Sequence, residues 1–214
     1  MGALIRDILE GSAKKFADIT AVRWLKKKEI FERSYRELME NAVAVRKGLL
    51  AEGFQGKHIS LIGASSVEWM ESYLGIITGN TVAVPLDAGL PGEDLIELIN
   101  RSDSEALFLS PKNKVLLDAV LKECPKLRKI WLLQEEAAES TEEKISSLAE
   151  LKAAAQNTGA DAGRPAPEDV ATIIFTSGTT GKSKGVMLTQ YNLASNVEAV
   201  DYSTEPGSVL LSVL

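Results

Sequence analysis

The chain has 214 residues, 45% of them hydrophobic, so it can bury a sizeable core as one large domain or two small ones. Its formal net charge of −6 argues against a nucleic-acid-binding surface, which is normally basic. With one cysteine and one histidine, the chain can form neither an intrachain disulfide nor a Cys/His zinc site.

The first fifty residues predict a helix, a hairpin and a second helix. Apolar side chains recur three and four residues apart over residues 4–16, which is typical of an amphipathic helix. Residues 20–25 and 29–33 favour two short strands joined by the lysine triplet 26–28. We interpret this triplet as a solvated turn, in preference to a phosphate-binding or membrane-binding patch.

Beyond the hairpin, helices and apolar strands alternate. Ser34 and Glu37 form a capping box that opens a helix ending near Gly53. Strands are then expected at 58–63, 81–85, 106–109 and 129–133, and helices at 66–77, from Pro91 onward and at 112–124. Alternation at this spacing argues for βαβ units with right-handed crossovers. The predicted fold class is therefore α/β, with a mainly parallel sheet flanked by helices.

An acidic run and a connector follow. Five glutamates between residues 135 and 143 indicate a solvated loop. The functional alternative is a metal site, but the glutamates do not occupy the regularly alternating positions of a calcium-binding loop. A helix is expected from about Thr141 to Ala155. Residues 159–168, with two prolines, predict a surface connector. We expect this connector to separate an α/β subdomain of residues 1–158 from the start of a second subdomain at 169–214.

Residues 176–185 carry the clearest chemistry in the chain. They follow a β-branched run at 170–175 that predicts a buried strand, and they consist of glycines, hydroxyl side chains and two lysines. Glycines allow backbone N–H groups to approach a ligand, and consecutive N–H groups form a nest that favours anions. A lysine ammonium adds a point charge suited to phosphate oxygens. The stretch therefore predicts a polyphosphate-binding loop.

Two other interpretations of this loop are weaker. A flexible Ser/Gly linker rarely carries lysines directly after a buried strand. The Walker A pattern is G-x-x-x-x-G-K-[ST], and Gly181-Lys182-Ser183 matches its end. The first glycine of the pattern would have to be residue 176, which is Thr176. Such a loop must also open a helix, whereas residues 185–189 predict a strand, followed by a helix at 190–200.

The loop resembles the adenylate-forming superfamily, which includes acyl-CoA synthetases, luciferases and peptide-synthetase adenylation domains. Their phosphate loop reads Ser/Thr-Ser-Gly-Thr-Thr-Gly-x-Pro-Lys-Gly, and the chain departs from it only at Ser183, where proline is usual. Proline would restrict the open loop, so we expect weaker preorganisation here, by about 0.4–1 kcal/mol of entropy. The segments 65–77 and 82–87 look most like long-chain fatty acid–CoA ligases.

This resemblance implies a two-step reaction that converts a carboxylic acid and ATP, with Mg²⁺, into an acyl-adenylate and then transfers the acyl group to coenzyme A. It implies nucleotide binding by Thr176, Ser177, Gly178, Thr179, Thr180, Gly181 and Lys184. No catalytic residue and no metal ligand is assigned within these residues. The family's adenine-binding Tyr-Gly-x-Thr-Glu segment does not occur, so the chain is expected to be an inactive N-terminal fragment of a longer enzyme.

The remaining chemically notable residues are interpreted as structural. These are the single His58, the single Cys124, and Asp87 at the end of a strand. The chain contains no run of about 18 apolar residues that would predict a membrane span, while peripheral contact with a membrane stays open. The start of the chain lacks the plan of a secretory signal, so a cytoplasmic location is expected. Other adenylate-forming enzymes, a P-loop kinase or NTPase and a non-catalytic interaction domain remain as alternatives.

Overall fold

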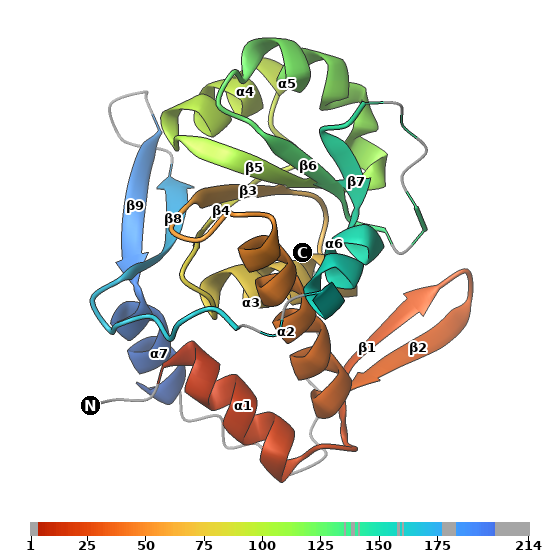
Figure 1. Ribbon diagram of the computed structural model, residues 1–214, viewed down its shortest axis with the longest axis vertical. Coiled ribbons are helices and arrows are strands. Elements are labelled where there is room, and N and C mark those ends of the chain that lie inside the picture. The colour runs from red at the N-terminus through yellow and green to blue at the C-terminus, as the bar shows by residue number, and fades with distance from the viewer. Residues whose placement is uncertain are drawn as a thin grey trace.

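The computed structural model describes residues 4–134, 136–137, 140, 142–157, 159, 161–176 and 183–199. Within them, one seven-stranded sheet has the order β7-β6-β5-β3-β4-β8-β9 (Figure 1). Its strands are β3 (His58–Ile62), β4 (Val82–Leu86), β5 (Ser104–Leu109), β6 (Lys129–Leu132), β7 (Ile145–Ser147), β8 (Val170–Thr176) and β9 (Lys184–Thr189). All neighbouring pairs are parallel except β8 and β9. The predicted α/β class and mainly parallel sheet are confirmed.

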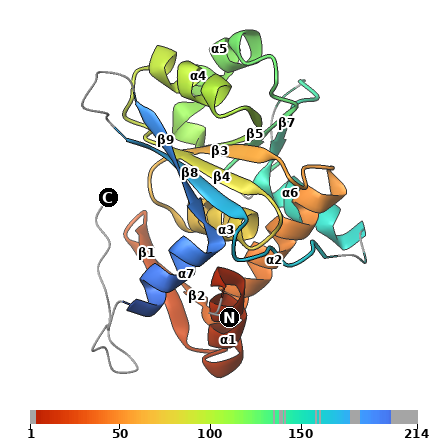
Figure 2. The ribbon, with the colours of Figure 1, turned by 90° about the vertical axis from the view of Figure 1, so that its left-hand side faces the viewer.

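Helices cover both faces of this sheet (Figures 1 and 2). They are α1 (Ile5–Lys15), α2 (Tyr35–Ala51), α3 (Val67–Ile77), α4 (Gly92–Arg101), α5 (Leu117–Glu123), α6 (Leu148–Ala154) and α7 (Gln190–Ala199), with 3₁₀ turns η1 (Pro111–Leu116) and η2 (Ala155–Asn157). Because successive strand residues point to opposite faces, Phe108 and Trp131 pack toward α2, α3 and α6, while Leu107 and Ile130 pack toward α4 and α5. The two apolar clusters form one core divided by the sheet.

The N-terminal elements match their predictions closely. The Ser34 hydroxyl oxygen accepts a hydrogen bond from the Glu37 N–H, and the Ser34 N–H donates to the Glu37 carboxylate, so the predicted capping box opens α2. A separate two-stranded antiparallel hairpin, β1 (Thr20–Lys26) and β2 (Glu29–Ser34), precedes it. Gly53, with φ +75°, follows the end of α2 in the left-handed conformation that glycine tolerates.

Two helix predictions need correction. The expected helix at 112–124 is a 3₁₀ turn followed by the short α5, an arrangement that is frequent at the N-termini of α-helices. The helix expected from Thr141 was wrong at its start: Ile145 pairs with Ile130 at the edge of the sheet, and α6 begins only after Ser147. Ser147 caps α6 through a second capping box with Glu150. Pro91 is the residue before α4 rather than its first residue.

Strands β8 and β9, which follow the predicted connector in the sequence, join the sheet formed by the strands that precede it. Strand β8 joins the sheet beside β4, where Ala83 lies opposite Thr172 and the Thr172 hydroxyl donates to the Ala83 carbonyl oxygen at 2.9 Å. Both sides of segment 159–168 therefore contribute strands to one sheet, and the proposed subdomain boundary stays a prediction. The expected terminal strand at 207–214 lies outside the described residues.

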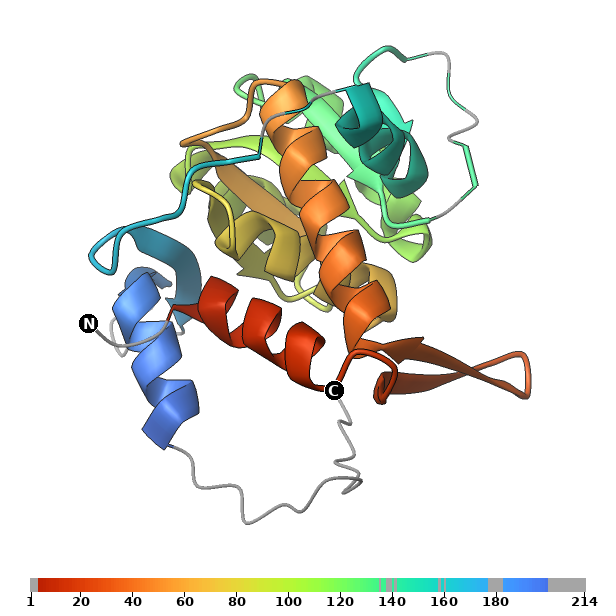
Figure 3. The same ribbon diagram turned by 60° about the horizontal axis from the view of Figure 1, so that its bottom comes forward.

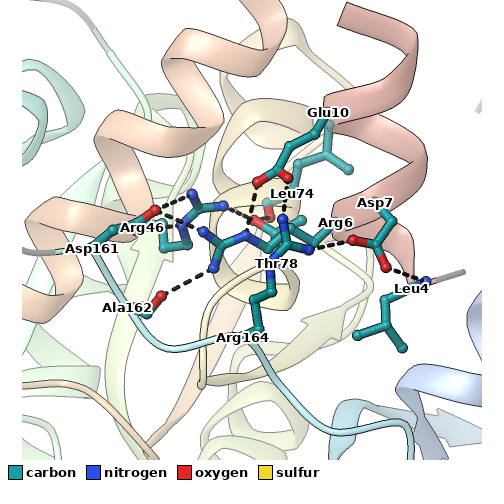
Figure 4. Close-up of polar contacts among 10 residues, drawn as sticks. All are labelled: Leu4, Arg6, Asp7, Glu10, Arg46, Leu74, Thr78, Asp161, Ala162 and Arg164. Carbon is teal, nitrogen blue, oxygen red and sulfur yellow. Dashed lines mark hydrogen bonds and ion pairs between the residues drawn. The ribbon is translucent and has the colours of Figure 1, made fainter. Parts of the chain in front are cut away.

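The connector itself is fixed by charges. The Asp161 carboxylate accepts hydrogen bonds from Arg46 of α2 at 2.6 and 2.7 Å and from Arg6 of α1 at 2.8 Å (Figure 4). Both guanidinium groups are nearly inaccessible to solvent, and Arg6 also donates to the Ala162 carbonyl oxygen at 3.0 Å. Arg164 extends the cluster to Asp7 and Glu10. This network joins three segments that are far apart in the sequence.

Candidate functional site

The predicted phosphate loop joins two adjacent antiparallel strands. Thr176 is the last residue of β8 and Lys184 the first of β9, and the two are direct partners in the ladder. Directly opposite residues in an antiparallel pair project from the same face of the sheet. The Thr176 hydroxyl and the Lys184 ammonium, both exposed, therefore share one face at the base of the loop.

The structure locates only part of the predicted site. Residues 177–182, which include Ser177, Gly178, Thr179, Thr180 and Gly181, lie outside the described residues. Thr176 and Lys184 are the predicted ligands that it places, and it brings them together. Thr176 stands at the carboxyl end of a parallel strand, which is where open α/β sheets bind their ligands. The donor set that is visible, a hydroxyl and an ammonium, suits phosphate oxygens.

A residue of α4 holds the carboxyl-terminal side of this loop. The Arg101 guanidinium donates to the backbone carbonyl oxygen of Ser183 at 2.7 Å and lies over the Phe175 ring, 5.6 Å from its centroid. It also pairs with Glu97 one helical turn earlier, at 3.1 Å. Arg101 thus braces both strands next to the loop, from the face opposite to Lys184.

No sequence signal could have identified Arg101. It resembles any basic residue in the last turn of a helix, where cations are favoured by the helix dipole. Its partner Ser183 lies 82 residues further along the chain. Gly185 supports the same packing, because a Cβ there would meet the Ile173 methyl at 3.1 Å and the Phe175 ring at 3.4 Å.

The residues expected to be structural have structural partners. The His58 Nδ1–H donates to the Ser102 carbonyl oxygen at 2.6 Å. Cys124 is buried, and this burial raises the pKa of its thiol to about 11, so it stays protonated at neutral pH. Asp87 accepts a hydrogen bond from the Gly89 N–H at 2.9 Å, which shapes the turn after β4. Among the described residues, no three His, Cys, Asp or Glu side chains come together as a metal site.

A buried carboxylate with two cationic partners lies away from the loop. The Glu71 carboxylate of α3 is fully buried between Lys152 of α6, at 2.9 Å, and Arg33 of β2, at 3.4 Å. Burial raises the pKa of Glu71, and the two cations oppose that rise only in part. An open groove of about 590 Å³ lies nearby between α2 and α6. Helix α6, which lines this groove, lies near the β7 end of the sheet, whereas β8 and β9, the strands before and after the phosphate loop, lie at the other end (Figure 1).

The strand after the loop also decides between nucleotide-binding classes. A Walker A loop leads into a helix, whereas residues from Lys184 to Thr189 form β9. The arrangement of strand, loop and antiparallel strand is the one expected from the resemblance described above. Residues 9–214 match the family model described as AMP-binding enzyme. The chain belongs to the AMP-binding enzyme family.

Several AMP-binding enzymes are similar to this chain over most of its length. Long-chain-fatty-acid–CoA ligase 5 of Rattus norvegicus is 31% identical over 185 residues, which cover 81% of this chain and 27% of that protein. The peroxisomal long chain acyl-CoA synthetase 7 of Arabidopsis thaliana is 32% identical over 190 residues, covering 85% and 27%. This chain thus spans about a quarter of the length of these relatives.

Solved structures support the fold independently. The crystal structure of a long-chain-fatty-acid-CoA ligase from Archaeoglobus fulgidus superposes with a TM-score of 0.77 at 23% identity, covering 92% of this chain and 39% of that chain. At that identity the likeness shows a shared fold for this part of the AMP-binding enzymes. Within the described residues, none of the helices is long and apolar enough to cross a membrane.

Proposed function

We propose that the chain is the phosphate-binding part of an ATP-dependent acyl-CoA synthetase. In the first step, a carboxylate oxygen attacks the α-phosphorus of ATP, which forms an acyl-adenylate and releases pyrophosphate. In the second, the thiol of coenzyme A attacks the acyl carbon and AMP leaves. The observation that carries the proposal is the pairing of Thr176 with Lys184 on one face, across the mouth of a loop with the adenylate-forming pattern.

The loop is proposed to stabilise the charge that develops on the departing pyrophosphate. Donors placed beforehand around the β- and γ-phosphates are effective because they need no reorganisation during the reaction. Lys184 supplies positive charge, and Mg²⁺ bound to the phosphate oxygens would neutralise more. Hydroxyls are assigned to Thr176, Ser177, Thr179 and Thr180, and backbone N–H donors to Gly178 and Gly181. Arg101 is assigned a positioning role, since its polar and ring contacts with the described part of the chain are to Ser183, Phe175 and Glu97.

The proposed acid is a long-chain fatty acid. Support comes from the names of the relatives and from segments 65–77 and 82–87, while the acyl pocket is assigned to sequence beyond Leu214. The proposed location is the cytoplasm, although one relative is named as peroxisomal. We retain residues 159–168 as the proposed boundary between two subdomains.

The proposal is tested in a longer protein that continues past Leu214. With palmitate, ATP, Mg²⁺ and coenzyme A it should release AMP and pyrophosphate in equal amounts. Lys184→Ala should lower kcat/KM for ATP by about 10²-fold, as expected for removal of one preorganised electrostatic contact. Lys182→Ala removes the same charge two residues earlier and should change this value less than threefold. Equal losses in the two variants would refute the assigned role of Lys184.

The same measurements separate the rival functions. A P-loop kinase or NTPase would release ADP instead of AMP, and a non-catalytic interaction domain would show neither product and no thermal stabilisation by ATP. The 214-residue chain alone should release no pyrophosphate. Release of pyrophosphate from ATP and palmitate by this chain would contradict its assignment as an inactive part.

A further inference from the structure

The β1–β2 hairpin stands away from the body of the molecule. Figures 1 and 3 both show it projecting beyond α1 and α2, and its two strands pair only with each other. On its inner face Trp24 stacks on Phe31 within the hairpin, with ring centroids 5.9 Å apart, and Arg33 connects the hairpin to the buried Glu71 of α3. The base of the hairpin is therefore held in place, and none of the described elements covers its tip.

The outer face of the hairpin carries an exposed apolar pair next to its tip. Leu25 and Ile30 are direct cross-strand partners and are 71% and 67% exposed. Direct partners project from the same face, so the two side chains form one small apolar surface. Packing within the described residues does not account for them, since the core clusters on either side of the sheet include neither residue.

The turn beside this pair combines positive charge with backbone strain. Lys27 and Lys28 form a two-residue loop with φ values of 49° and 69°, in the left-handed region that asparagine and glycine normally occupy in such turns. With Lys26 they place three ammonium groups at the tip, against one carboxylate, Glu29. None of these four side chains is ion-paired to another described residue, unlike Arg23 and Glu32 further down the hairpin, which pair with each other.

We propose that the hairpin tip docks on an anionic phospholipid bilayer. Leu25 and Ile30 would enter the boundary between headgroups and acyl chains, while Lys27 and Lys28 of the adjoining turn keep their ammonium groups among the phosphates. The tip is positive although the whole chain has a net charge of −6, so charge complementarity selects this end for an anionic surface. A protein partner fits less well, because two apolar side chains provide little of the area that a specific interface buries.

This inference stands apart from the proposed catalytic function, since it depends only on the hairpin. The sequence alone favoured a solvated turn for the lysine triplet. The structure adds the Leu25–Ile30 pair on the adjoining outer face and the strained backbone that presents Lys27 and Lys28.

Vesicle flotation of a turn variant tests whether the lysines of the hairpin tip contribute to membrane binding. Lys27→Asn with Lys28→Gly replaces the turn by the pair that its backbone favours, so the hairpin should fold at least as well while losing two charges. Binding of the chain to vesicles of phosphatidylcholine with 30% phosphatidylserine should weaken by about twentyfold to thirtyfold. Lys112→Asn with Lys114→Asn, which removes two exposed charges from η1, should weaken binding less than twofold.

A second measurement reports insertion of the apolar pair. Cys124 is buried, so Leu25→Cys offers a single reactive thiol for an environment-sensitive NBD label. The label at 25 should shift to shorter wavelength on the anionic vesicles, and one at Val115→Cys, which is 88% exposed on η1, should not. Leu25→Thr with Ile30→Thr keeps strand propensity and should also weaken flotation.

Three outcomes would overturn the proposal. The first is an unshifted label at position 25 or an equal shift at both positions. The second is equal loss of binding in the tip variant and the Lys112/Lys114 control. The third is self-association of the chain that Leu25→Thr with Ile30→Thr abolishes, without any vesicle binding, which would identify the occupant as a second copy.

Discussion

At the scale of single residues, Glu71 and Glu105 show how the surroundings of a carboxylate set the sign of its contribution to stability. Burial raises the pKa of Glu71, whereas a hydrogen bond from Lys57, helped by Arg128, lowers the pKa of Glu105. The Lys57 Nζ lies 2.7 Å from Glu105. When folding raises the pKa of a carboxyl group, that group stabilises the fold fully at pH values below its pKa in the unfolded chain. The contribution is lost as the pH rises through its pKa in the folded chain. A lowered pKa has the opposite effect.

The two glutamates therefore predict opposite pH dependences. As the pH rises from 4 to 8, the wild-type chain should lose stability relative to Glu71→Gln, because the unfolded carboxyl ionises before the folded one. Relative to Glu105→Gln it should gain stability between the lowered folded pKa and the ordinary pKa of glutamate. Urea denaturation from about pH 3 to pH 8, a range that includes pH values below the ordinary pKa of glutamate, measures both differences, with each variant serving as the control for the other. The same sign for both would show that burial does not dominate at Glu71.

At the scale of elements, α2 is the helix against which others pack most closely, and glycines set the distances. At Gly48 of α2, a Cβ would lie 2.4 Å from the Leu151 carbonyl oxygen of α6. At Gly75 of α3, it would lie 2.6 Å from the side chain of Val45. Both contacts are far inside the normal separation, so these glycines allow α3 and α6 to approach α2. Gly11 of α1 has nothing within 4 Å of the same position.

Alanine substitutions should distinguish close packing from helix propensity. Gly48→Ala should lower the free energy of unfolding by about 1–3 kcal/mol, because α6 must move to admit the methyl group. Gly11→Ala should raise it by about 0.5–1 kcal/mol, because alanine favours the helix and meets no neighbour. Chemical denaturation measures both. Stabilisation by Gly48→Ala would mean that α2 and α6 lie further apart than described.

At the scale of the whole molecule, Asp161 ties the connector to two helices. Burial of its carboxyl would raise its pKa, but the hydrogen bond from Arg46 and the charges of Arg46 and Arg6 outweigh this and lower it. Removing the charge would leave the Arg46 guanidinium, 3% exposed, without its main anionic partner among the described residues. The connector is therefore held by a few strong contacts instead of a broad apolar surface.

Asp161→Asn should lower the free energy of unfolding by about 2–3 kcal/mol at pH 7. The loss should shrink as the pH falls through the lowered folded pKa of Asp161, because the wild-type carboxyl then also becomes neutral. Asp18→Asn breaks an exposed pair with Arg36 and should cost less than about 1 kcal/mol. Thermal unfolding at pH 7 compares the two, and equal costs would show that the connector network is not a major support.

The sequence predicted those parts of the fold that depend on local pattern. Capping at Ser34, the alternation of strands and helices, and a strand rather than a helix after the phosphate loop all follow from residues close together in the chain. The features that the sequence did not predict depend on residues far apart in the chain. Strand β7 forms because Ile145 pairs with Ile130 at the sheet edge, and Arg101 donates a hydrogen bond to Ser183. For the site, the pattern predicted nucleotide-binding residues that stay a prediction, and the structure placed two of them, Thr176 and Lys184, opposite each other.

The insertion of β8 beside β4 also has a consequence for the order in which the protein is assembled. Strands β3 to β7 form from a continuous stretch that ends at Ser147, whereas one edge of β4 stays open until β8, which begins at Val170 and ends at Thr176, has been made. At a synthesis rate of about 5–20 residues per second, β4 waits with an unpaired, apolar edge on the ribosome for roughly ten seconds. Such an edge is a template for wrong strand pairing, so this interval is when the nascent chain is most prone to misfold and to need a chaperone.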